Sequence, residues 1–216
     1  MGKKHLIVID PAVEKPAIES FNRIARIAKY PVTYYLPALF GFGNSLKLDR
    51  NTLGIIVLGS AASVHDGFEW QQALTNILIK SFEKKIPVMG ICYGHQHIAQ
   101  ICGGTVGPLW NNNKKQGVRN VELIKNSLYG NAINGPMIFS HKEGVTSIPR
   151  DFEIIAKSDM VDIDGFASST KPIWGFQTHI EATQAFIDHH NIPIEDMEKP
   201  CQFGHTILDK FINSLL

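Results

Sequence analysis

Four short apolar segments without polar alternation, separated by helical patterns, constrain the fold of this chain more than any other feature. They occupy residues 6–9, 32–36, 53–58 and 88–91, and apolar residues recur at helical spacing through 16–29 and 68–82. A strand with no polar face is buried on both sides, which is typical of parallel strands joined by helices. The sequence therefore predicts an α/β fold, an open, mostly parallel, doubly wound sheet with helices on both faces.

The second half of the chain has a different texture. From Gly104 onward the strand-like segments are shorter, at residues 118–124, 137–140, 153–157 and 173–177, and a helix from about His205 to Leu216 closes the chain. We therefore expect a smaller strand-rich part in the second half. No Pro-, Gly- or Ser-rich linker divides the chain, so we expect a single domain over residues 1–216.

Composition and charge argue against several classes of function. Lys and Arg number 21 against 20 Asp and Glu, with no basic block, so a nucleic-acid partner is not expected. The longest apolar runs are far shorter than the roughly 20 residues of a membrane span, and the first is too short for a signal peptide. Three cysteines without a CxxC pair fit a reducing compartment. We expect a cytoplasmic protein with no membrane association.

The sharpest local motif is G-x-C-x-G at residues 90–94, which follows an apolar strand and precedes a helical stretch. Glycines on both sides of a nucleophile permit a tight strand-to-helix turn that exposes the nucleophile above the sheet. The sulfur of Cys92 would then lie at a helix N-terminus, where the helix dipole favours a thiolate. The backbone N–H of Tyr93 would face a developing oxyanion.

A cysteine at the end of a strand can instead be a small core residue, and for a cysteine without context that role is the commoner one. The two flanking glycines favour a nucleophile at Cys92. Cys102 and Cys201 lack such a setting, so we assign both to packing.

A thiol nucleophile needs a base, and the base needs an acceptor that orients it. His179 leaves an apolar strand and is followed two residues later by Glu181. Alternate residues of a strand share a face, so Glu181 would hold the ring of His179. Alone, such a pair is more often solvated or half of a metal site, but zinc would need further ligands nearby, and we expect no metal. A less favoured pair, in a polar region typical of a solvated helix end, is His189 and His190.

Taken together, these motifs resemble the class I glutamine amidotransferases, most closely the amidotransferase domain of GMP synthases. The resemblance covers most of the chain and rests on four segments in the family's order. They are a glycine-rich loop at 58–66, the strand-to-helix turn around Cys92 at 90–96, which we call the elbow, a pocket motif at 139–145 and the segment with base and acid at 171–181. It implies a flavodoxin-like α/β domain without a cofactor, and a catalytic triad of Cys92, His179 and Glu181.

The resemblance also implies roles for residues around this triad. The glycine-rich loop supplies a second oxyanion N–H, from Gly59, beside that of Tyr93. The glutamine pocket is implied to include Gln96, Ser140, His141 and Lys142.

The chain departs from the family pattern in three places. Ile180 stands where the family usually has Pro, Leu58 and Ser60 replace Gly and Pro in the oxyanion loop, and Lys142 with Glu143 replaces Gly-Asp in the pocket motif. None of these changes removes a group of the triad. They indicate a subfamily whose glutamine pocket or partner surface differs.

The resemblance therefore implies hydrolysis of the side-chain amide of glutamine through a Cys92 thioester, with the ammonia passing to an acceptor made by a separate ATP-using synthetase. The chain has neither a GxxxxGK[ST] loop nor a Ser-Gly-Gly phosphate loop of such a synthetase. Two alternatives stay open: a stand-alone hydrolase or transferase of γ-glutamyl amides or peptides, and a non-catalytic regulatory module of the same fold.

Overall fold

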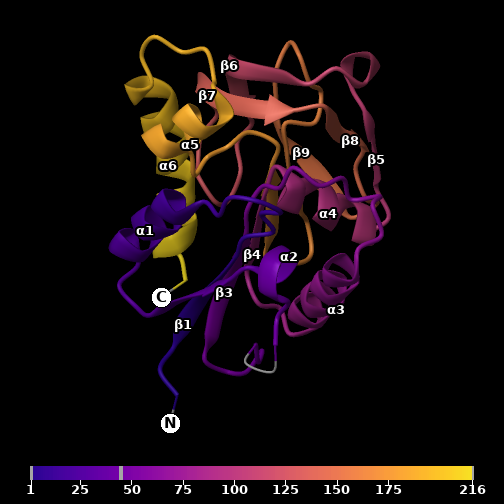
Figure 1. Cartoon of the computed structure of the whole chain (residues 1–216), viewed down its shortest axis with the longest axis vertical. Helices are drawn as coiled ribbons and strands as arrows, with labels where there is room; N and C mark the ends of the chain where they lie inside the picture. Colours follow the sequence, from indigo (N-terminus) through magenta and orange to yellow (C-terminus); the bar gives the residue numbers. More distant parts are fainter. Residues whose placement is uncertain (1, 44–45, 216) are drawn as a thin grey trace.

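The structure is a computed structural model that describes residues 2–43 and 46–215. Its main sheet has the strand order β2-β1-β3-β4-β11-β10-β9-β6-β7 (Figure 1). The first five strands of this order are parallel: β2 (Val32–Tyr35), β1 (His5–Ile9), β3 (Thr52–Val57), β4 (Val88–Ile91) and β11 (Ile173–Phe176). The order 2-1-3-4 followed by a fifth parallel strand is that of flavodoxin-like sheets.

The strands of the second half extend the same sheet in antiparallel fashion. They are β10 (Gly165–Ser168), β9 (Phe152–Lys157), β6 (Lys115–Leu123) and β7 (Ile133–His141). A separate two-stranded sheet pairs β5 (Thr105–Pro108) with β8 (Glu143–Ser147), and a short 3₁₀ turn covers Trp110–Asn112. The predicted strand-rich part is therefore mainly a continuation of the parallel sheet.

Helices cover both faces of the sheet, which confirms the predicted fold class. On one face α1 (Ile18–Ile27) and α6 (Glu198–Asn213) share an apolar cluster with alternate residues of β1. On the other face α3 (Glu69–Glu83) and α4 (Tyr93–Ile101) pack on the residues in between. Figure 1 shows these two helical layers on opposite sides of the sheet. Two short helices complete the fold, α2 (Pro37–Phe40) and α5 (Gln184–His190).

The helix predicted from about His205 begins earlier, at Glu198. Pro200 lies in the first turn of α6, where its missing N–H would have had no partner within the helix, so the proline is tolerated there. The helix then buries Leu208 and Phe211 completely. Apolar spacing identified the body of this helix but not its start.

The topology also fixes where a site can form. In parallel sheets the loops that follow the strands gather at one edge, and ligands bind there. β1, β3, β4 and β11 are neighbours and run in one direction. The segments that follow them, including Cys92 and His179, therefore meet at this edge. Across residues 2–43 and 46–215, no helix combines the length and the apolar composition of a membrane-spanning segment.

Burial of α6 against the sheet gives a stability prediction. Phe211 is fully buried and lies edge-on to Trp174, with ring centroids 6.0 Å apart. We expect Phe211→Ala to lower the free energy of unfolding by about 3–5 kcal/mol, because it leaves a cavity in the core. The matched control is Phe40→Ala, since Phe40 is 79% exposed, and it should change stability by less than about 0.5 kcal/mol. Urea unfolding of both variants measures this, and equal losses would contradict the packing described.

Candidate active site

The G-x-C-x-G motif forms a sharp turn between β4 and α4. Cys92 is the N-cap residue of α4 and has φ 50° and ψ −100°, a conformation that residues with a side chain seldom adopt. A Cβ on Gly90 would lie 2.6 Å from the carbonyl oxygen of Gly94, and a Cβ on Gly94 would lie 2.4 Å from that of Val57. Both glycines are therefore required by the close approach of α4 to the sheet.

This turn puts Cys92 at the positive end of the α4 dipole. Tyr93 is the first residue of the helix, where backbone N–H groups have no partner within the helix. Its phenol is buried in the core and accepts a hydrogen bond from Gln71 Nε2 at 3.1 Å. The backbone of Tyr93 can thus face an anion beside the sulfur while its side chain anchors the helix.

A turn, not a continuing strand, brings His179 and Glu181 together. β11 ends at Phe176, and the N–H of Ala182 donates to the carbonyl oxygen of His179 at 3.2 Å. In this turn Nδ1 of His179 lies 2.8 Å from Oε1 of Glu181, and both side chains are buried. The expected contact is present, but its expected cause, alternation along one strand face, is wrong.

The charges around His179 favour the protonated ring. Burial alone would lower the pKa of His179, because it removes water from the charged form. The charges of Glu181 and Cys92 outweigh this effect and raise the pKa from 6.5 to about 10. An imidazolium held between the carboxylate and the sulfur is therefore the favoured state of this residue.

Gly59, in the loop after β3, lies against the side chains of His179 and Cys92. A Cβ at this position would be 2.9 Å from Cε1 of His179 and 3.6 Å from Cβ of Cys92. The next residue, Ser60, donates its hydroxyl to the carbonyl oxygen of Pro11 at 2.7 Å. The loop after β3 is thereby tied to the loop after β1, and it brings backbone rather than a side chain up to the sulfur.

One cavity is lined by all four residues that the resemblance assigns to the glutamine pocket, namely Gln96, Ser140, His141 and Lys142. These side chains differ in how far they are exposed to solvent. His141 is enclosed, with Nδ1 2.8 Å from the carbonyl oxygen of Glu143 and Nε2 3.0 Å from Nη1 of Arg119. Burial and the charge of Arg119 lower the pKa of His141 to about 3, so the ring is neutral. It supports the pocket wall, whereas Lys142 is exposed at its rim.

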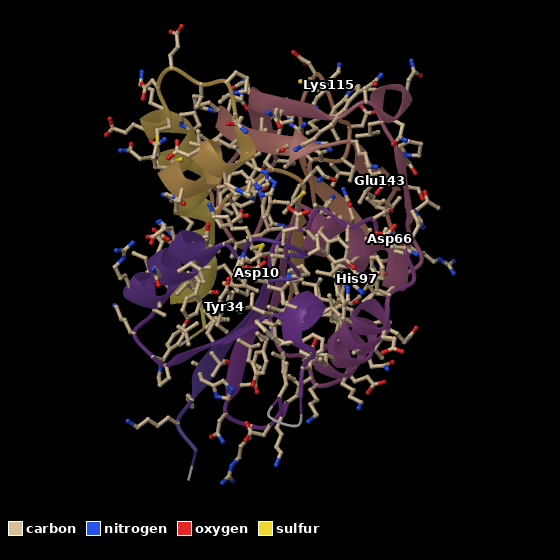
Figure 2. The ribbon with its side chains drawn as sticks, in the orientation of Figure 1. Asp10, Tyr34, Asp66, His97, Lys115 and Glu143 are labelled. Atoms are coloured by element: carbon tan, nitrogen blue, oxygen red, sulfur yellow. The ribbon has the colours of Figure 1, made fainter. Side chains whose placement is uncertain are left out.

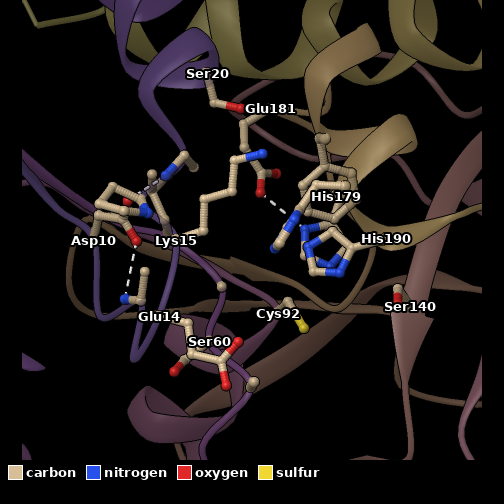
Figure 3. A pocket seen from close by; sticks show the side chains of 18 of the residues that line it. Asp10, Glu14, Lys15, Ser20, Ser60, Cys92, Ser140, His179, Glu181 and His190 are labelled. Atoms are coloured by element: carbon tan, nitrogen blue, oxygen red, sulfur yellow. Dashed lines mark hydrogen bonds and ion pairs between the residues drawn. The ribbon is translucent and has the colours of Figure 1, made fainter.

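The cavity has a volume of about 500 Å³ and extends to both sides of the sulfur. Figure 3 shows Ser140 to one side of Cys92 and Lys15 to the other, with Ser20 farther away, beyond His179 and Glu181. On that far side the hydroxyl of Ser20 and Oε2 of Glu181 are buried, and within the described residues neither has a hydrogen-bond partner. The pocket therefore has a polar end beyond the triad.

Asp10 belongs to the site but was not singled out from the sequence. It follows β1, and it accepts hydrogen bonds from the N–H groups of Ala12 at 3.0 Å and Ala17 at 2.7 Å and from the hydroxyl of Tyr34 (Figures 2 and 3). Burial raises its pKa, and the charge of Glu181 adds to the increase. Asp10 thus shapes the loop that lines the far end of the pocket. The sequence signal that could have identified Asp10 is its position directly after a buried strand.

A buried ion pair was also missed. Arg119 on β6 contacts Asp164, which precedes β10, and both side chains are almost completely buried. The guanidinium also lies over the ring of Phe139, 4.6 Å from its centroid, and holds His141 as described. No sequence signal joins the two partners, because they are 45 residues apart along the chain and come together only in the folded protein.

The other candidates of the sequence lie outside the triad. His190 packs on Phe186 at 4.3 Å between ring centroids, and Phe186 in turn packs on His179 at 4.3 Å, so His190 borders the pocket from α5. Burial raises the pKa of both Cys102 and Cys201 to about 11, which keeps them as thiols. Over residues 2–43 and 46–215 no group of three or more potential metal ligands is found.

Comparison with known proteins identifies the family of this chain. The profile described as glutamine amidotransferase class-I matches residues 37–194. The chain belongs to this family. It is 34% identical over 142 residues to one subunit of the glutamine-hydrolyzing GMP synthase of Methanobrevibacter smithii, an alignment that covers 64% of this chain and 70% of that one.

Two further matches define how far the similarity reaches. The glutamine-hydrolyzing GMP synthase of Fusobacterium nucleatum is 35% identical over 141 residues, which cover 64% of this chain and 26% of that protein. This amidotransferase thus matches about a quarter of that synthase. The structure of a glutamine amidotransferase from Thermotoga maritima has a TM-score of 0.78 at 17% identity and covers 100% of this chain and 99% of that one. It shares the fold.

The departures of this class I amidotransferase from the family pattern have local structural roles. Ser60 anchors the loop after β3, as described above. Ile180 is fully buried under α6, where a Cβ on Gly204 would lie 2.9 Å from its Cα. Glu143 acts through its main chain, because its carbonyl oxygen accepts from both Gln96 and His141. With these residues in place, Nδ1 of His179 still contacts Oε1 of Glu181, at 2.8 Å.

The His179–Glu181 contact of the amidotransferase gives a pH prediction. The pKa of His179 in the folded protein, near 10, exceeds the value of 6.5 for a free histidine, so the contact stabilises the fold fully below about pH 6.5. This contribution is lost as the pH rises through 10. Urea unfolding should therefore show a wild-type advantage over Glu181→Gln that shrinks between pH 6.5 and 10.

The control for this measurement is Glu122→Gln, which removes the exposed ion pair with Lys157, at 3.3 Å. Exposed pairs contribute little, so this variant should follow the wild type across the whole pH range. An advantage over Glu181→Gln that stays constant or grows with pH would contradict the raised pKa of His179.

Proposed function

We propose that this amidotransferase hydrolyses the side-chain amide of glutamine to glutamate and ammonia, with Cys92 as nucleophile, His179 as acid and base, and Glu181 as the group that orients and charges the imidazole. One observation carries the assignment. The loops after β3, β4 and β11 bring Gly59, Cys92 and the His179–Glu181 pair to one pocket. The fold supports this assignment because these strands are neighbours in a parallel sheet.

In the first half of the reaction, the Cys92 thiolate attacks the amide carbon of glutamine and a C–S bond forms. The negative charge that develops on the carbonyl oxygen is stabilised by the backbone N–H groups of Gly59 and Tyr93. His179 gives its proton to the nitrogen as the C–N bond breaks, and ammonia leaves.

In the second half, water attacks the thioester. His179, now neutral, takes a proton from that water and keeps it as the C–S bond breaks. The thiolate and the imidazolium are thereby restored, and the carboxyl group of the product gives its proton to the solvent. Glutamate leaves, and the site returns to its starting state. Gln96, Ser140, His141 and Lys142 form the wall against which the rest of glutamine binds.

We further propose that the ammonia is used by an ATP-using synthetase on another chain. The relatives from Methanobrevibacter smithii and Methanocaldococcus jannaschii are each named as one subunit of a glutamine-hydrolyzing GMP synthase, and the alignments cover 70% and 67% of those chains. Their names support a role for this chain in supplying ammonia to a partner. A cytoplasmic location is supported by three cysteines that are all free.

A single domain over residues 1–216 is also proposed. The apolar cluster on one face of the sheet joins residues of β1, near the N-terminus, to residues of α6. The two parts of the chain therefore share one core.

A second candidate function is hydrolysis of γ-glutamyl amides larger than glutamine. It is favoured by the extent of the pocket beyond His179, where Ser20 Oγ and Glu181 Oε2 are buried and, in the described part of the chain, unpartnered. A leaving amine larger than ammonia would occupy this end of the pocket.

The nucleophile is tested by Cys92→Ala. We expect glutamate release from glutamine to fall by at least about 10⁴-fold, because no thioester can form. The control is Cys102→Ala at the end of α4, which should keep activity within a few-fold of wild type, since Cys102 only packs. Steady-state release of glutamate measures both, and activity retained in Cys92→Ala would overturn the mechanism.

The substrate is tested by comparing glutamine with N-alkyl γ-glutamyl amides and γ-glutamyl peptides. We expect kcat/KM for glutamine to exceed that for the substituted amides by at least about tenfold, because buried polar groups fitted to a primary amide are left unpaired by its N-alkyl analogue. The reverse order would instead establish the second candidate. Assays with and without a co-purified synthetase partner show whether docking raises glutamine turnover.

A further inference from the structure

We propose that Gln177 is a positioning residue for the nucleophile, whose side-chain amide donates a hydrogen bond to the sulfur of Cys92 and stabilises it as the thiolate. The proposal rests on the function of Cys92 proposed above. Gln177 directly follows β11 and has no exposed surface. Its Nε2 lies 3.6 Å from Sγ of Cys92, within hydrogen-bond distance of a sulfur acceptor.

The main chain holds Gln177 in place independently of the triad. Its backbone N–H donates to the carbonyl oxygen of Asp164 at 2.8 Å, which ties it to the segment before β10. The side chain then reaches from β11 toward the elbow at the end of β4, the neighbouring strand. The contact with Cys92 is thus set by the register of two parallel strands.

The orientation of the Gln177 amide follows from a main-chain carbonyl. A carbonyl oxygen can only accept, so the atom of Gln96 that lies 2.8 Å from the carbonyl oxygen of Glu143 must be the donor Nε2. The same Nε2 lies 3.1 Å from one end of the Gln177 amide, which must therefore be Oε1. The other end, facing Cys92, is the NH₂ group. The reverse orientation would place two NH₂ groups together.

The N–H donor of Gln177 offsets the effect of burial on the sulfur. Cys92 is buried, and burial disfavours a charged sulfur. A neutral N–H donor stabilises an anion more than a neutral thiol, because hydrogen bonds to charged groups are the stronger ones. Gln177 therefore favours the thiolate without adding a charge to a pocket that has to accept a zwitterionic amino acid.

The same chain of contacts links the pocket wall to the nucleophile. Gln96 lines the pocket, and its Nε2 is shared between Glu143 and Gln177. A substrate that contacts Gln96 acts on the group that also holds Gln177 toward the sulfur. The position of the nucleophile is thus joined to the site where substrate binds.

The test compares three variants of the full chain. Gln177→Met has a similar length but no donor, and Gln177→Glu has the same shape with a carboxylate oxygen in place of the NH₂ group. The matched control is Thr178→Val, which removes a neighbouring buried hydrogen bond to a different sulfur, from Thr178 Oγ1 to Met137 Sδ at 3.0 Å. The readouts are the rate of alkylation of Cys92 by iodoacetamide against pH, measured by mass spectrometry, and kcat and KM for glutamine.

For Gln177→Met we expect the midpoint of the alkylation profile to move up by about one pH unit, the size of one lost hydrogen bond to a charged group. We expect kcat to fall by about tenfold or more and KM to change by less than about threefold. Gln177→Glu should move the profile further in the same direction, because its charge opposes the thiolate. Thr178→Val should leave the profile unchanged.

An unchanged alkylation profile in folded Gln177→Met and Gln177→Glu would overturn the proposal, even if kcat fell, since a purely structural role would give that result. A shift of equal size in Thr178→Val would overturn it as well. If Gln177→Met does not fold, Gln177→Glu decides. The profile does not require glutamine to be hydrolysed, so failure of this inference is distinct from activity retained in Cys92→Ala, which would overturn the proposed function.

Discussion

The close contact between α4 and the sheet is the constraint on which the rest of the site depends. With Gly94 against the backbone of Val57, and Gly90 against Gly94, no side chain fits between helix and strand. The chain must then turn within one residue, and Cys92 takes a positive φ that is unfavourable for it. That local cost is offset by the packing of α4, and it sets the sulfur, the start of the helix and the N–H of Tyr93 in one fixed relation.

Other groups are brought to this fixed point by neighbouring strands. The loop after β3 presents backbone at Gly59, because any side chain there would collide with His179. The turn after β11 presents a buried His179 whose charge is sustained by Glu181. The proposed chemistry requires a charged imidazole next to the sulfur, and a backbone wall that lies against both Cys92 and His179.

Parallel strands and the elbow could be predicted from the sequence because their signals are local, namely apolar runs without alternation and glycines at fixed spacing. The choice of His179 and Glu181 needed the family resemblance, and strand alternation was the wrong reason for it, since β11 ends at Phe176. Asp10, Gln177 and the Arg119–Asp164 pair were not predicted. Their partners lie on loops and strands that meet only after folding, so no spacing along the chain reveals them.

The central claim is that the elbow makes Cys92, and not Cys102 or Cys201, the nucleophile toward glutamine. An electrophilic diazoketone analogue of glutamine tests it most directly, with the labelled residue identified by peptide mass spectrometry. We predict one adduct per chain, on Cys92, formed more slowly when glutamine is present in excess. Labelling of Cys102 or Cys201, or glutamine hydrolysis that continues in protein with no adduct on Cys92, would contradict the claim.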